Sequence, residues 1–270
     1  MWVRRLAFAL AVLFSLPAGA QEVAELSQAR PAAPAPWSPR IYLMDGGTHS
    51  LLEKTLLGER FPSLPVTIDS RWVSQVYPDV DFWGVDLAKI RGALTAFTQE
   101  AEREQRVPAG KPRPLRVLWL GSTLVGAPDA WAKQVSRLAK TALIIVPAGN
   151  DPHEDSSEIW TSRGLKVGFA PGGRIEGSGD QKKTVVVYLD FGPIEIYIPG
   201  RGTFPLGATS TASDLFAGHL ASVLGRGIGA ALTPTQIAAK LRTGFRGSDG
   251  HAAIVPEDEL EARITQVLSH

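Results

Sequence analysis

The stretch Gly207-Ala-Thr-Ser210-Thr-Ala-Ser213 leads directly into an apolar segment with helical spacing that runs to residue 224. A serine at this place can cap the helix, with its hydroxyl accepting a hydrogen bond from a backbone N–H. It can also act as a nucleophile, because backbone amides and the dipole at a helix N-terminus stabilise a developing oxyanion. For a single serine, capping is the commoner role, so the rest of the sequence must decide what Ser210 does.

Short β-rich runs alternate with helical segments along most of the chain. The expected strands are 41–45, 115–120, 142–148, 166–169, 184–190 and 194–198, and the expected helices are 84–105, 130–140, 210–224, 234–241 and 257–268. Continuous apolar strands are typical of a sheet that is covered on both faces. The pattern therefore predicts an α/β fold with three layers, in which a mostly parallel central sheet carries helices on both faces.

The first forty residues have a different composition from the rest. Arg4 and Arg5 precede the apolar run 6–16, and Ala18-Gly-Ala20 has the form of a cleavage site, so 1–20 is expected to be a secretory signal peptide. A membrane anchor would need roughly 20 apolar residues. The Ala/Pro-rich stretch 21–39 is expected to be a linker and 40–270 the folded domain, exported to the periplasm or the extracellular space.

Composition excludes several classes of function. The chain has no cysteine, so no disulfide supports the fold, and its formal charge of +1 becomes −1 when Arg4 and Arg5 leave with the signal peptide. Such a balance gives no electrostatic attraction for nucleic acid or an anionic membrane. No residues have zinc-ligand spacing, and the acidic run 151–155 is interpreted as a solvated loop. We therefore expect no metal or cofactor, and the oligomeric state stays open.

Two polar residues follow expected strands at positions where α/β proteins form sites. Asp45 ends the first strand before Gly46-Gly47, and its carboxylate would lie at the carboxyl edge of the sheet. Asn150 ends 142–150, where a side-chain amide could stabilise an oxyanion, a contribution of roughly 2.7–4 kcal/mol in measured cases. Alone, Asp45 before two glycines is more often a turn former, whereas Asn150 alone is equally compatible with an ordinary turn.

Taken in order, these motifs resemble those of the subtilisin-like serine proteases (subtilases, peptidase family S8) between residues 41 and 245. The family's nucleophile pattern is G-T-S-M-A-S/T-P followed by A-G. The residues of this chain that match it are Thr209, Ser210, Ala212, Ser213, Ala217 and Gly218. The chain departs from the pattern at Ala208, which replaces the glycine, and at Asp214, which replaces the proline. Ala148-Gly-Asn150 matches the asparagine motif A-G-N, and Asp45 with Gly47 matches D-S/T-G. The sequence 232–237 also resembles the L-T-P-x-Q opening of the family's next helix. The resemblance implies Ser210 as nucleophile, Asp45 as acid and Asn150 on the oxyanion side.

The family's catalytic histidine has no counterpart in this alignment. Its motif, H-G-T-x-V-A, is best matched by Trp83-Gly-Val-Asp-Leu-Ala88, which puts Trp83 at the position of the histidine. An indole nitrogen only donates hydrogen bonds, so Trp83 cannot accept a proton from Ser210. The loss of one member of such a triad leaves roughly 10³–10⁴-fold catalysis over water.

Another histidine could take over the role of the base. His49 is expected in the exposed loop after Asp45, and His153 follows Asn150 by three residues. His219 is nine residues after Ser210, about 900° around the helix, and is expected to be a packing or surface residue. The two histidines near the C-terminus are expected to be solvated.

The leading interpretation is an exported subtilisin-like domain that is catalytically impaired and binds peptide or protein. The resemblance implies that an extended peptide pairs with the strand at Leu120, Gly121 and Ser122. One alternative is an active serine hydrolase with His49 or His153 as a non-standard base. A second is an unrelated doubly wound binding domain, in which Asp45, Asn150 and Ser210 would not converge.

Overall fold

In the computed structural model, residues Ala35–His270 form one compact unit. The structure describes residues 35–44, 47–69, 87–108, 110–120, 131–149, 162–175 and 184–270. Among the described helices, none is both long and apolar enough to cross a membrane.

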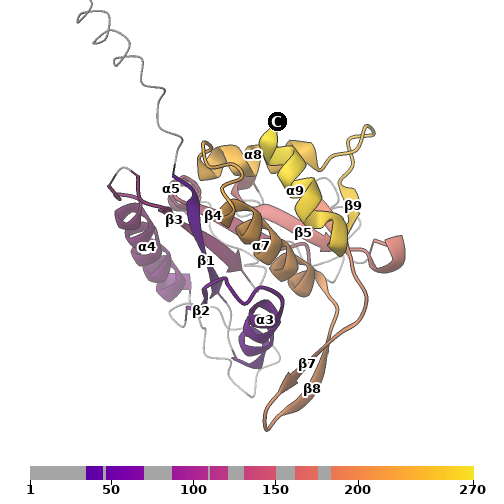
Figure 1. Ribbon diagram of the computed structural model, residues 1–270. Helices are drawn as coiled ribbons and strands as arrows, with labels where there is room; N and C mark the ends of the chain where they lie inside the picture. The colour runs from indigo at the N-terminus through magenta and orange to yellow at the C-terminus, as the bar shows by residue number, and fades with distance from the viewer. Residues whose placement is uncertain are drawn as a thin grey trace, which may run out of the picture. The chain divides into compact units, whose positions relative to one another are not determined.

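A seven-stranded sheet forms the centre of this unit (Figure 1). Its strand order is β2-β1-β3-β4-β5-β6-β9, and every neighbouring pair is parallel. The strands are β1 (Trp37–Met44), β2 (Val66–Ile68), β3 (Arg113–Leu120), β4 (Ala142–Pro147), β5 (Leu165–Phe169), β6 (Val185–Asp190) and β9 (Ala253–Pro256). The predicted α/β class with a mostly parallel sheet is confirmed.

Two details of the strands differ from the expectation. β1 begins at Trp37, so the last residues assigned to the linker belong to the sheet; Trp37 is buried beneath the guanidinium of Arg113. β7 (Ile194–Ile198) does not join the central sheet but pairs antiparallel with β8 (Gly202–Leu206). This ribbon reaches away from the sheet in Figure 1 and leads into the Ser210 segment.

Helices cover both faces of the sheet, as predicted. The helices α3 (Gly47–Arg60), α7 (Thr209–Gly225), α8 (Pro234–Gly244) and α9 (Leu260–Ser269) share one apolar core with the sheet. The helices α4 (Leu87–Glu104) and α5 (Ala132–Leu138) share a second core on the opposite face. Side chains alternate along β3: Val117 and Trp119 enter the first core, whereas Leu118 and Leu120 enter the second.

The helix α3 is absent from the sequence prediction. Its N-terminus coincides with the Gly46-Gly47 pair, which was interpreted as a turn, but Leu52 and Leu56 behind it have the spacing of a buried helical face. His49 therefore lies in the first turn of α3. The expectation of an exposed loop at His49 is wrong, and the side chain is only 34% exposed.

The start of α8 is as predicted. Thr233 caps α8 with a reciprocal capping box to Gln236, and Pro234 occupies the first helical position. Gly218 on α7 lets the ring of Phe61 approach closely, because a Cβ there would lie 2.1 Å from the ring. The end of α3 is thereby held against the middle of α7.

Candidate functional site around Ser210

Ser210 is the second residue of α7, and its side chain is half-buried. The N-cap is Ala208, and no side chain caps the helix. Among the described residues, the Ser210 hydroxyl has no hydrogen-bond partner. Capping therefore does not explain this serine, whose hydroxyl lies at the positive end of a seventeen-residue helix.

The backbone of this first turn is fixed by hydrogen bonds from the sheet. The indole Nε1–H of Trp119 donates to Ser213 Oγ at 2.7 Å, and Ser213 Oγ donates to the carbonyl oxygen of Ser210 at 2.7 Å. Trp119 and Ser213 are both fully buried. Because buried polar groups are costly to leave unpaired, this relay fixes where Ser210 lies relative to the end of β3.

An imidazole lies beside the same indole. The rings of His49 and Trp119 have centroids 5.9 Å apart at an interplanar angle of 34°. His49 Nε2 lies 3.3 Å from Oε1 of Glu53, one turn further along α3. Glu53 is completely buried, and its carboxylate oxygens make no hydrogen bond to any residue that the structure describes. A histidine paired with a buried acid thus packs on the indole that hydrogen-bonds Ser213.

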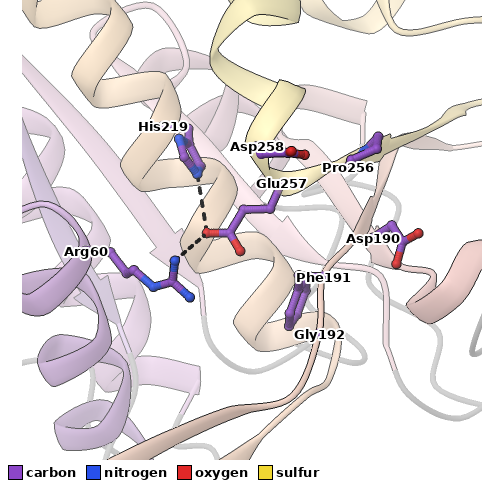
Figure 2. Close-up of a pocket in the computed structure, with 8 residues that line it drawn as sticks. All are labelled: Arg60, Asp190, Phe191, Gly192, His219, Pro256, Glu257 and Asp258. Carbon is purple, nitrogen blue, oxygen red and sulfur yellow. Dashed lines mark ion pairs between the residues drawn. The ribbon is translucent and has the colours of Figure 1, made fainter.

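His219 lies in a different environment, further along α7 (Figure 2). Its Nδ1 is 3.3 Å from Glu261 and its Nε2 is 3.7 Å from Glu257. Arg60 pairs with Glu257 at 3.3 Å, and Arg226 pairs with Glu261 at 2.7 Å. The polar contacts of His219 within the described part of the chain are with these two glutamates and not with Ser210. This agrees with the structural role expected for His219.

The two glutamates of this cluster titrate lower than usual. The hydrogen bond with His219, assisted by the charge of Arg60, lowers the pKa of Glu257 despite its burial. Burial opposes the shift at Glu261, but hydrogen bonds from Arg226 and His219 still lower its pKa. A shallow pocket of about 560 Å³ adjoins the cluster at the ends of β6 and β9.

Most of the residues predicted for the site lie outside the described part of the chain. These are Asp45, Trp83, Gly121, Ser122, Asn150 and His153. Their roles stay predictions. The residues directly before three of them are described. Met44 and Leu120 are the last residues of β1 and β3, and Gly149 comes two residues after the end of the neighbouring strand β4. Parallel strands end at one edge, which is the edge where sites form in such sheets.

Leu120 itself is described and buried. Its side chain packs in the core beneath α4 and α5, on the face opposite α7. Its backbone is level with Met44 of β1. A peptide could therefore contact Leu120 only through its main chain.

The helix expected to carry Trp83 does not lie beside Ser210. α4 begins at Leu87 and packs on the face opposite α7. A base must come within hydrogen-bonding reach of its nucleophile. Of the described helices between β1 and β3, α3 is the one on the α7 face. Sequence reasoning missed α3 and Glu53, although Glu53 follows His49 at the i,i+4 spacing that places both on one helix face.

Comparison with solved structures identifies the fold. The chain is similar to the protease PagA, described as the prenylagaramide maturation protease, with 15% identity over 88% of this chain and 96% of that one at a TM-score of 0.58. The A-subunit of the AB5 toxin from E. coli matches at 13% identity over 84% and 93%, with a TM-score of 0.55. A cold-adapted subtilisin-like serine proteinase matches at 14% over 80% and 88%, with a TM-score of 0.53.

The chain has a subtilisin-like fold. No protein-family model matches it, and no curated protein matches it. At 13–15% identity the solved structures establish the fold alone. The function must therefore be inferred from the residues of the site.

Proposed function

We propose that this protein is a catalytically impaired subtilisin-like domain that binds extended peptide or unfolded protein at the first turn of α7. The observation that carries the proposal is the state of the Ser210 hydroxyl, which has no hydrogen bond to any described imidazole. His49 packs on the indole of Trp119 and lies beside Glu53. A serine without an engaged base is a weak nucleophile.

The surroundings of Ser210 favour retention of a binding site. The Trp119–Ser213–Ser210 relay keeps this turn fixed at the carboxyl edge of the sheet. β1 and β3 end at the same edge. A peptide that lies along this edge would meet the backbone N–H groups at the start of α7, which have no side-chain cap. We also propose export, because residues 1–20 have the pattern of a signal peptide.

Binding is tested with fluorescein-labelled casein, an unfolded chain, by fluorescence anisotropy. We expect saturable binding that weakens at least tenfold in Ser210→Leu, because a larger side chain would cover the backbone N–H groups at the start of α7. The matched control, Ser269→Leu, changes an exposed serine at the end of α9 and is expected to bind as the parent does. Absence of binding, or equal binding by both variants, would contradict a peptide site at Ser210.

A further inference from the structure

Basic side chains gather on the face of the molecule that α4 and α5 form, opposite the face of α7. Five bases on these two helices, or within two residues of their ends, are exposed and have no ion-pair partner among the described residues. These five residues, named the basic face below, are Arg91, Arg103, Arg106, Lys133 and Lys140.

The acids of the same two helices are already paired with other arginines. Arg116, a buried residue of β3, binds Glu100 at 3.1 Å and Glu104 at 2.8 Å. Arg137 binds Glu102 through two hydrogen bonds. The sequences of α4 and α5 contain no further acid. The negative charge of this side of the molecule is therefore used within the fold, and the basic face keeps its charge.

The two helices lie side by side and run in the same direction. Near their N-terminal ends Gln134 of α5 donates a hydrogen bond to the hydroxyl of Thr95 on α4. Near their C-terminal ends Gln105 donates to the carbonyl oxygen of Thr141 at 2.9 Å. With eighteen residues, α4 is about 27 Å long. The basic face is thus spread in two dimensions over a pair of neighbouring helices.

Helix dipoles account for only part of this charge. The negative end of α4 favours Arg103, which lies in its last turn. Lys133 lies in the first turn of α5, where the dipole disfavours a cation and no acid offsets it. Arg91 is five residues into α4 and gains nothing from the dipole. The fold therefore carries bases on this face without local compensation, as expected of a surface that meets an external anion.

The chemistry of the face distinguishes between kinds of anionic partner. Among the described residues, the exposed large apolar side chains are Ile175, Tyr197 and Ile254, and none of them lies on α4 or α5. Interfaces between proteins have an apolar core, which this face does not offer. Anionic lipid headgroups attract basic side chains by charge alone, and guanidinium groups match the oxygens of a phosphate.

We propose that the basic face binds the phosphate groups of an anionic lipid surface. The proposal uses the proposed export, because the phosphate-bearing surface that an exported protein meets is a bilayer. It does not depend on the peptide site at Ser210. It departs from the expectation drawn from a net charge near zero, since that value averages over sides of the molecule with unlike charge.

The test is co-sedimentation of residues 21–270, which contain the whole compact unit, with vesicles of phosphatidylglycerol and phosphatidylcholine in equal parts. Arg106→Gln/Lys140→Gln is compared with Lys54→Gln/Arg174→Gln, which removes the same charge at exposed positions away from α4 and α5. Each base near an anionic surface strengthens binding about fivefold, so we expect binding about 25-fold weaker in the first variant and changed less than about twofold in the second.

The conditions of the assay decide what the face binds. We expect binding to disappear on vesicles of phosphatidylcholine alone and in about 1 M salt, where charges are screened over about 3 Å. Absence of binding to the anionic vesicles, equal weakening in the two double variants, or binding that persists on neutral vesicles would overturn the inference. Tighter binding to a DNA duplex at the same phosphate concentration would overturn it in favour of nucleic acid. Casein binding is measured separately, so either result can fail while the other stands.

Discussion

Two histidines lie on the helices of one face of the sheet, and their partners differ in kind. His219 lies between Glu257 and Glu261, and each glutamate also pairs with an arginine. His49 has Glu53, which is buried and, within the described part of the chain, has neither an arginine nor a hydrogen-bond partner. A network of paired, partly exposed charges is an ordinary way to join helices, whereas an isolated buried acid is retained against stability. The contrast separates a structural cluster from a candidate for chemistry.

The largest effect on the free energy of unfolding is expected at Gly218, next to His219, where α7 packs against Phe61. Gly218→Val places a side chain in the space of the Phe61 ring, and overpacking of this kind lowers the free energy of unfolding by up to about 3 kcal/mol. Urea denaturation measures it. Gly92→Ala is the control: Gly92 lies in α4 with open space around it, so the change is expected to stabilise by about 0.5–1 kcal/mol. Equal effects of the two changes would show that α7 is not tightly packed at Gly218.

A smaller effect on the free energy of unfolding is expected from a change at Ser213, in the first turn of α7. Ser213→Ala leaves the buried Trp119 N–H without an acceptor, which lowers the free energy of unfolding by about 2 kcal/mol. Ser222→Ala, further along α7, removes contacts with Arg226 and Glu261 near the protein surface and is expected to change stability by less than about 0.5 kcal/mol. A neutral Ser213→Ala would mean that the relay does not fix this turn.

The smallest effect depends on pH and concerns the His219 cluster. The folded-state pKa of Glu257 lies below its ordinary value, so its stabilisation is present above the unfolded-state pKa and is lost as pH falls through the folded-state pKa. Glu257→Gln is therefore expected to be about 1 kcal/mol less stable than the parent near pH 7, with the difference disappearing once the pH falls below the folded-state pKa of Glu257. Glu259→Gln, an exposed neighbour, is the control and is expected to show no such difference. A gap that widens on acidification would contradict the assigned role of Glu257.

The architecture was predictable because buried strands and amphipathic helices leave strong local patterns. The run at β4 is continuously apolar, those at β3 and β6 are apolar over most of their length, and Thr233-Pro234 has the composition of a helix start. β9 has only four residues, and the sequence did not indicate it as a strand. The helix α3 was missed because two glycines at its start predict a turn, and only packing against the sheet and α7 shows that the chain continues as a helix.

The site was predictable only in part. Ser210 was found from its motif, and the structure excludes the capping role for it. Glu53 could not be recognised as buried from its own residue type, since most glutamates are solvated. The partnership of His49 with Trp119 joins α3 to β3 across many residues of chain, and no local pattern encodes such a contact.

The central claim is that the chain retains Ser210 but lacks a base that supports peptide cleavage. It is tested most directly by turnover of a quenched fluorescent peptide library, comparing the parent with Ser210→Ala. We expect Ser210-dependent hydrolysis no faster than roughly 10³–10⁴-fold over water, which is the catalytic activity that remains when a triad lacks a working member. Ser210-dependent turnover with kcat between about 1 and 10³ s⁻¹, as in ordinary enzymes, would contradict the account.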